Sequence, residues 1–196
     1  LGIDFGTILR HGGTAIFHPG AVLSALKPAV ASLKSEDATK SAQKYIEAHR
    51  LGDVHTYVTR KVWPELPWTG DLKQDKKIAK QNPPWDQAPG HDYRFQCKRI
   101  QHGSNYGLSP FGISMIAHIP LKEAKRAYEN YMSEFDRIPA WQAWVRNEIA
   151  EHRPLTNPLG REVTLFGRPW DPHTAKQGFA FLPSSTLADI EDLALV

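Results

Sequence analysis

Three side chains that could bind an anionic ligand recur at four-residue intervals in the middle of the sequence. They are Arg94, Lys98 and His102. In a helix, this spacing places them on one side, about one turn apart. Two cations and a flat ring on one face suit an anionic ligand with an aromatic part, such as a nucleotide. From spacing alone, the simpler interpretation is a solvated basic face on an ordinary amphipathic helix.

The helix that must position these side chains is predicted at residues 94–107. Gln101 and Asn105 continue its polar face, and the opposite face is expected to pack against the core. That packing face consists of Tyr93, Cys97 and Ile100. The pair Tyr106-Gly107 closes the helix, with the glycine just beyond the C-cap. We therefore expect Cys97 to be a small core residue and not a nucleophile.

Positive charge is concentrated around this helix. The net charge is +3, and residues 71–107 contain seven Lys or Arg against four Asp. Such a surplus attracts phosphates from a distance. The sequence has no run of eighteen apolar residues, so we expect no membrane span. A single cysteine in 196 residues excludes an internal disulfide and fits a reducing, cytoplasmic compartment.

Periodicity and turn residues together predict a mostly α protein with a small β-hairpin (α+β). A short charged helix is expected at residues 71–81, followed by a proline-containing loop at 82–90. Amphipathic helices are expected at 121–135 and 140–151, with Ile138-Pro139 as the break between them. These elements place most of the predicted core on helices that flank residues 94–107.

The hairpin and a final, interrupted helix are predicted near the end of the chain. The strands are expected at 155–156 and 162–166, joined by the turn Asn157-Pro158-Leu159-Gly160. The helix that follows is expected to stop at Pro183, which lacks a backbone N–H. Thr186 can then cap a restarted helix.

The pattern Arg94-x3-Lys98-x7-Tyr106-Gly107 resembles the fingers-helix motif of family A DNA polymerases, the class of bacterial DNA polymerase I and its phage relatives. The resemblance implies that Arg94 and Lys98 are catalytic groups that hold the phosphates of an incoming deoxynucleoside triphosphate (dNTP). It also implies that Tyr106 and Gly107 lie beside the template DNA. His102 stands where the family usually has Phe, and its flat ring can still stack on the nucleotide.

Two earlier segments resemble further elements of this family. Residues 53–56, Asp-Val-His-Thr, are similar to an Asp-Ile-His-Thr element whose histidine donates a hydrogen bond to the triphosphate, which implies that role for His55. Asp53 can also cap the following helix. Asp4-Phe5 matches the first two positions of the metal-binding motif at the end of a palm strand. Asp4 is thus a candidate catalytic metal ligand, although an Asp after a short apolar run is common.

Two later segments resemble DNA-contacting elements of the family. Leu155 to Arg161 is similar to a Thr-x-x-Gly-Arg turn, and Arg161 and Arg168 are candidates either for DNA-backbone contact or for ordinary surface charge. Residues 183–190 resemble a Pro-x-Gln-Gly-Thr-x-x-Asp segment. The Gln that reads the minor groove is absent, and Ser184 or Ser185 occupies its place.

The resemblance predicts the fingers and part of the palm of a right-hand, phage-type polymerase. We expect residues 1–51 to form an uncertain palm-edge or aberrant segment. Residues 52–196 then form the fingers with a partial palm, including a Pro- and Lys-rich insert at 64–92. The implied partners are primer–template DNA, dNTP and the remainder of the polymerase chain, without a membrane, in a bacterial or infected-host cytoplasm.

The implied chemistry is nucleotidyl transfer with two Mg²⁺ ions. The family's second catalytic Asp belongs to a His-Asp motif downstream of residues 183–190, so we expect this chain alone to be inactive in primer extension. One alternative is a non-catalytic nucleic-acid-binding remnant of a polymerase. Another is a small all-helical interaction protein, which leaves the ordered motifs unexplained.

Overall fold

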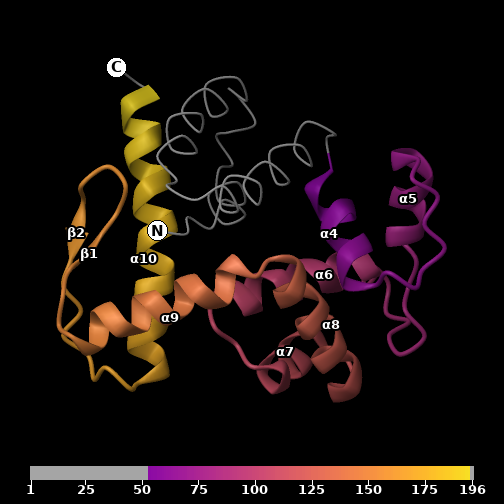
Figure 1. The fold of residues 1–196 in the computed structure, drawn as a ribbon. Coiled ribbons are helices and arrows are strands. Elements are labelled where there is room, and N and C mark those ends of the chain that lie inside the picture. Colours follow the sequence, from indigo (N-terminus) through magenta and orange to yellow (C-terminus); the bar gives the residue numbers. More distant parts are fainter. Residues whose placement is uncertain (1–52, 195–196) are drawn as a thin grey trace. The chain divides into compact units, whose positions relative to one another are not determined.

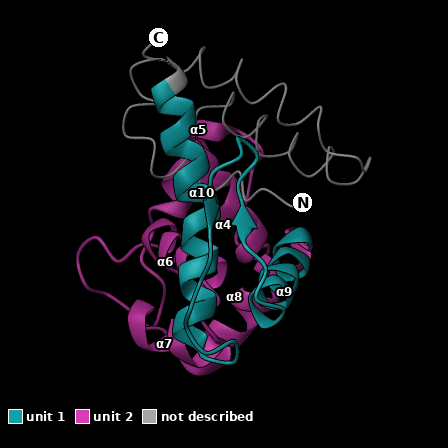
Figure 2. Cartoon of the chain, turned by 90° about the vertical axis from the view of Figure 1, so that its left-hand side faces the viewer, with its two compact units in different colours: residues 1–46, 137–196 teal, residues 47–136 magenta. Residues whose placement is uncertain are grey.

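The computed structural model describes residues 53–194, so the predicted metal ligand Asp4 lies outside the described residues. Within this range the chain is mostly helical, with one two-stranded antiparallel sheet (Figure 1). The predicted fold class is therefore confirmed. The chain divides into two compact units (Figure 2): unit 2 is Glu47–Asp136, and unit 1 combines Leu1–Ile46 with Arg137–Val196. No helix between residues 53 and 194 is long and apolar enough to cross a membrane.

Helix α6 lies among the other helices of unit 2. α6 (Tyr93–Asn105) packs against α4 (Val54–Val62), α7 (Pro110–Ala117) and α8 (Leu121–Glu134), and α5 (Leu72–Ala79) packs against α4. Large side chains fill the interior between them, including Val58, Val62, Trp63, Ile100, Ile113, Tyr131 and Phe135. Because α6 has neighbours on several sides, only part of its circumference is open to solvent.

Side-chain caps fix where four of these helices begin. Asp53, Asp71, Asp92 and Ser109 precede α4, α5, α6 and α7, and each accepts a hydrogen bond from the backbone N–H three residues later. A cap of this kind stabilises a helix start by roughly 1 kcal/mol. The short charged helix predicted from residue 71 is confirmed, and residues 82–90 form the predicted loop.

Unit 1 contains α9 (Arg137–Ala150), the hairpin and α10 (Pro172–Ala194). In the hairpin, β1 (Leu155–Thr156) pairs with β2 (Glu162–Val163), and Leu155 lies opposite Val163. The Asn157 side chain holds the turn by accepting hydrogen bonds from the backbone N–H groups of Leu159 and Arg161, each at 2.9 Å. The buried side chains include Trp141, Val145, Ile149, Leu155 and Phe179. α9 and α10 pack together and support the hairpin.

Two predicted boundaries in unit 1 are wrong, and both involve proline. Ile138-Pro139 does not separate helices, because α9 already begins at Arg137 and includes both residues in its first turn. Proline is tolerated there, since first-turn N–H groups have no intrahelical acceptor. The second strand ends at Val163 and not at Phe166. The next pair in this register would join Thr164 to Pro154, which has no N–H to donate.

The predicted interruption at Pro183 is also wrong, because α10 runs through it without a break. Thr186 does not cap a new helix, since its hydroxyl donates a 2.6 Å hydrogen bond to the Leu182 carbonyl one turn earlier. Phe179, Leu182 and Leu187 are all buried. Packing on both sides of the proline therefore outweighs the one hydrogen bond that proline cannot make.

Candidate nucleotide-binding site

Helix α6 is held at both ends by local hydrogen bonds. At its start, the Asp92 carboxylate accepts a 2.6 Å hydrogen bond from the Phe95 N–H. At its end, the Gly107 N–H bonds to the Ser104 carbonyl at 3.0 Å and the Leu108 N–H to the Gly103 carbonyl at 2.9 Å. With Gly107 at φ 77°, this is a Schellman motif. The predicted glycine C-cap is therefore confirmed, and the helix position of each side chain is well defined.

The open arc of α6 carries the side chains that first suggested an anion site. Lys98 and His102 are exposed, and Arg94 lies partly buried one turn before Lys98. The His102 ring contacts the Tyr106 ring, with centroids 4.7 Å apart and planes inclined by 55°. The structure thus brings two cations and a pair of rings to one side of the helix, as the four-residue spacing predicted.

The polar face is narrower than the sequence predicted. Gln101 and Asn105 were expected to continue it, but they are only 1% and 2% exposed. Asn105 is turned inward, where its side-chain oxygen accepts a 2.8 Å hydrogen bond from the buried Tyr131 hydroxyl. A buried hydroxyl needs such a partner, so Asn105 serves the interior of unit 2.

Arg94 is held by the buried carboxylate of Asp53, which the sequence indicated only as a helix cap. Asp53 is 6% exposed, and its Oδ1 lies 3.1 Å from Arg94 Nη2. Its Oδ2 lies 3.6 Å from Lys76 Nζ. The predicted cap is also present, since Asp53 accepts a 3.1 Å hydrogen bond from the Thr56 N–H. No local signal could reveal the ion pair, because Asp53 and Arg94 are forty-one residues apart in sequence.

Several groups compete to set the ionisation of Asp53. Burial disfavours the charged carboxylate, but the hydrogen bond from the Thr56 N–H and the Arg94 guanidinium outweigh it, so the pKa of Asp53 lies below its ordinary value. Asp53 is therefore ionised at neutral pH. The site contains a fixed negative charge beside the cation that the sequence assigned to phosphate.

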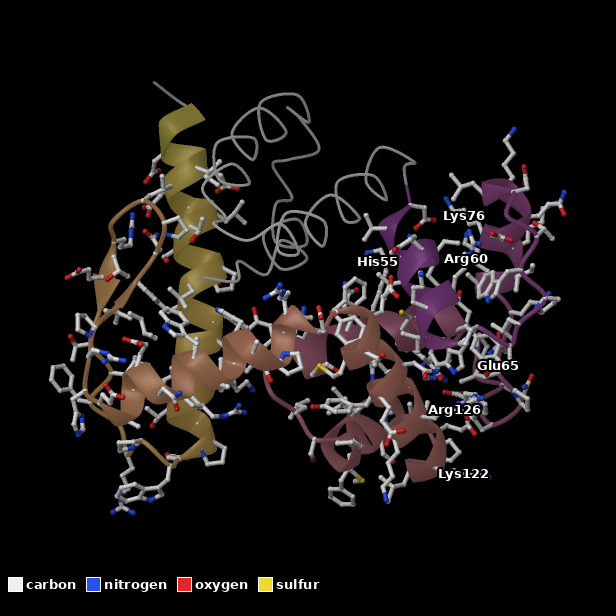
Figure 3. All side chains as sticks on the ribbon, viewed as in Figure 1. His55, Arg60, Glu65, Lys76, Lys122 and Arg126 are labelled. Carbon is white, nitrogen blue, oxygen red and sulfur yellow. The ribbon has the colours of Figure 1, made fainter. Side chains whose placement is uncertain are left out.

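His55 lies in the first turn of α4, two residues after Asp53, and is half-buried. Figure 3 shows His55 and Lys76 toward one end of unit 2, and Lys122 of α8 toward the other. Asp53 thus connects the start of α4, which carries His55, with α5 through Lys76 and with α6 through Arg94. One carboxylate orders three helices of unit 2 around the candidate site.

The remaining candidate DNA contacts lie in unit 1. Arg161 forms an ion pair with Asp189, so part of its charge is neutralised, whereas Arg168 is exposed. Ser184 is exposed, but Ser185 is buried and its hydroxyl accepts a 3.1 Å hydrogen bond from the Asn157 amide. Of the two serines, only Ser184 therefore presents its side chain to solvent.

The described residues do not supply a metal centre. No group of three or more His, Cys, Asp or Glu side chains between residues 53 and 194 is placed to hold a metal ion. The acidic side chains nearest the candidate site are paired with cations or cap helices, as Asp53 does with Arg94. A Mg²⁺ site built from these residues alone is not supported.

Comparisons with known proteins concern the fold and the family of the chain. No curated protein matches significantly. Among solved structures, one similar fold is the POL domain of Pol1 from M. smegmatis in complex with DNA primer-template and dNTP. It is 20% identical with a TM-score of 0.52, and the match covers 72% of this chain but only 23% of that one. The family model for DNA polymerase family A matches residues 76–175, just over half of the 196 residues. The chain therefore belongs to DNA polymerase family A.

Proposed function

We propose that unit 2 binds the triphosphate of an incoming dNTP through Arg94, Lys98 and His55, as part of a DNA-directed DNA polymerase. The observation that carries this proposal is the open arc of α6, which combines Arg94 and Lys98 with the ring pair of His102 and Tyr106. Arg94 and Lys98 lie inside the segment that matches the polymerase family. A polymerase domain of similar fold was solved with primer-template DNA and dNTP.

The chemistry assigned to these side chains is electrostatic. During phosphoryl transfer, negative charge builds on the transferred group and on the leaving pyrophosphate, and positioned cations stabilise it. The Arg94 guanidinium already makes charge-assisted contacts with the Asp53 carboxylate, at 3.1 and 3.4 Å. Phosphate oxygens accept hydrogen bonds as carboxylate oxygens do. The triphosphate therefore either shares the Arg94 guanidinium with Asp53 or displaces Asp53 from it.

We assign a different role to each of the two α6 rings. His102 is exposed beside Lys98, where its ring can stack on the sugar or base of the bound nucleotide. Tyr106 is half-buried at the C-cap, next to the turn at Gly107, and we assign both to the template side. The two rings contact each other, so both aromatic groups lie together at this end of the site.

In this proposal, unit 1 contributes contacts to the primer-template. Arg168 and Ser184 are exposed and can meet the DNA directly. Arg161 is paired with Asp189, so a phosphate must compete for it. Ser185 acts by positioning, since its hydroxyl holds the Asn157 side chain that forms the hairpin turn.

Family A polymerisation implies two Mg²⁺ ions held by palm carboxylates. Because residues 53–194 contain no suitable acidic cluster, we assign no step of the reaction to metal ligands among them. We propose that this chain binds nucleotide but does not extend a primer by itself. Templated extension by the purified chain, with Mg²⁺ and all four dNTPs, would refute that part of the proposal.

Calorimetric titration with a dNTP tests the assignment of Arg94 and Lys98. Charge-assisted contacts contribute roughly 1.5–3 kcal/mol each, so Arg94→Gln and Lys98→Gln should each weaken binding about 10- to 150-fold. Lys125→Gln is a matched control, because Lys125 is also an exposed helical lysine of unit 2. Unchanged affinity in both site variants would exclude the triphosphate role.

A second measurement separates this function from that of a non-catalytic remnant. A nucleic-acid-binding remnant would bind DNA with strong salt dependence and without any effect of dNTP. A polymerase fragment should show measurable dNTP affinity that depends on Arg94. Salt-dependent DNA binding combined with no detectable dNTP binding would favour the remnant.

A further inference from the structure

Helix α5 presents a row of lysines that the triphosphate site does not use. Lys73 and Lys77 of α5 and its C-cap residue Lys80 are exposed, and their spacing of four and three residues places them on one side of the helix. We call these three residues the lysine face. Lys76 lies beside them, but its ammonium group pairs with Asp53 at 3.6 Å. The lysine face belongs to the proline- and lysine-rich insert that precedes α6.

The structure separates the acidic residues of this segment from its lysines. Asp75 is the acidic residue within α5, and it is turned inward, where it is 1% exposed. It accepts hydrogen bonds from the Thr69 N–H at 2.7 Å and the Thr69 hydroxyl at 3.0 Å, and it pairs with Arg60 at 3.3 Å. Asp71 caps the helix by accepting a hydrogen bond from the Gln74 N–H. Within residues 53–194, no ion pair joins an acid to Lys73, Lys77 or Lys80.

This arrangement is unfavourable for the helix alone. Like charges four residues apart repel each other, and an eight-residue helix has little stability of its own. α5 is instead held by two ion pairs in which a buried carboxylate meets a partly exposed cation, Asp75 with Arg60 of α4 and Asp53 with Lys76. Exposed cations that no acidic residue of 53–194 neutralises, on a helix whose own Asp75 faces inward, favour a ligand with several negative charges.

The spacing of the lysine face fits a chain of phosphates. Lys80 is seven positions after Lys73, which corresponds to about 10 Å along a helix axis. One DNA strand carries a phosphate about every 3.4 Å along its axis, so the lysine face spans about three phosphates. The Lys76–Asp53–Arg94 link also ties this helix to α6, so a strand on α5 would run beside the nucleotide helix.

We propose that the lysine face of α5 binds the phosphodiester backbone of the nucleic acid that the polymerase holds. The inference rests on the proposed function, because it assumes that the chain binds nucleic acid. It adds a backbone contact outside the residues that the family motifs assign. Duplex DNA and a single strand share this chemistry, and the experiment below distinguishes them.

The test compares two double variants that each remove two exposed lysines three residues apart. The test variant is Lys77→Gln with Lys80→Gln on α5, and the control is Lys122→Gln with Lys125→Gln on α8. Figure 3 shows that Lys122 lies at the opposite end of unit 2 from Lys76 of α5. Both variants lower the net charge by the same amount, so only the location of the loss differs. Circular dichroism melts confirm that each variant is folded.

The readout is the slope of log affinity against log salt concentration, measured by fluorescence anisotropy with labelled oligonucleotides. If the lysine face contacts phosphates, the test variant should flatten the slope by about 1.8 on duplex DNA or about 1.4 on a single strand. The oligonucleotide on which this change appears identifies the bound form. Equal slopes in the test variant and wild type, or equal losses in both variants, would overturn the inference.

Titration of the test variant with dNTP shows whether the lysine face and the triphosphate site act independently. The test variant should retain wild-type dNTP affinity, because Lys77 and Lys80 do not belong to the triphosphate site. If wild type bound no DNA at any salt concentration, both the inference and the proposed DNA contacts would fail. If wild type bound DNA and only the slope prediction failed, the lysine face alone would be excluded.

Discussion

Replacing Asp53 by Asn removes its charge while keeping a helix cap, because Asn caps as well as Asp. The lost contacts are two hydrogen bonds from Arg94, at 3.1 and 3.4 Å, and the Lys76 pair at 3.6 Å. A charge-assisted hydrogen bond contributes roughly 1.5–3 kcal/mol. The Arg94 side chain is 23% exposed and recovers some hydration, so we expect a loss of about 2 kcal/mol. For a chain of this size, that lowers Tm by about 4–8 °C.

Comparison with Asp53→Ala separates the charge from the cap. Alanine loses both, so it should cost about 1 kcal/mol more than asparagine in urea unfolding followed by circular dichroism. If the Asn variant were as stable as wild type at pH 7, the ion pair would contribute nothing. If Ala and Asn had equal effects, the cap would contribute nothing.

The pH dependence gives an independent check on the same residue. Because the pKa of folded Asp53 is lowered, its stabilisation is complete above the ordinary carboxyl pKa of about 3.9 and is lost as pH falls through the folded value. The stability difference between wild type and Asp53→Asn should therefore be constant from pH 7 to about pH 5 and shrink below about pH 4. A difference that persisted unchanged to pH 3 would refute the electrostatic explanation.

Three further predictions concern backbone, packing and a phenol. Gly107→Ala should cost about 1 kcal/mol in thermal melts, because Gly107 has φ 77°, and Gly107→Asn should cost less. Gly178→Ala should cost about 1–3 kcal/mol in urea unfolding, since its Cβ would lie 2.8 Å from Val145 Cγ1; a neutral effect would contradict this packing. Burial and the neighbouring Glu134 raise the pKa of Tyr57 to about 12, so stability should fall as pH rises from 10 to 12. Tyr57→Phe should reduce that alkaline loss, and an unchanged pH profile would exclude Tyr57 as its source.

Local signals in the sequence predicted the elements that local chemistry determines. Helix α6 ends just before Gly107, as the Tyr-Gly pair indicated, and Asp53 caps α4. The hairpin turn forms where Asn157 and Gly160 predicted it. In each case, a short polar side chain or a glycine satisfies backbone groups within a few residues of itself, so sequence neighbours suffice for the prediction.

The errors arise where tertiary packing overrides a local preference. Pro183 was expected to end a helix, but buried neighbours on both sides of it keep α10 continuous. The spacing of polar residues predicted which side of α6 is exposed to solvent. It could not predict how many residues that side contains, because packing of α4, α7 and α8 determines how much of the helix is covered. Asn105 was therefore placed on the polar face, although it pairs with Tyr131 inside unit 2.

In the candidate site, too, local features were predictable from the sequence and tertiary contacts were not. The shared side of Arg94 and Lys98 follows from helix geometry, whereas the Asp53 ion pair joins residues that only the fold brings together. The charge segregation on α5 also depends on Asp75 pairing with Arg60 across two helices. Roles for the site residues in binding remain predictions, because they concern ligands and not the folded chain.

The buried thiol of Cys97 can serve as a chemical probe of how often helix α6 opens. It is the only cysteine in the sequence, and it lies on the packed side of α6, opposite the candidate nucleotide. A thiol reagent can reach it only when α6 separates from its neighbours, so the labelling rate measures how often that helix opens. A ligand that binds only the closed state lowers the population of the open state. The labelling rate must fall by the same factor. The labelling rate of Cys97 therefore reports ligand binding on the opposite side of α6.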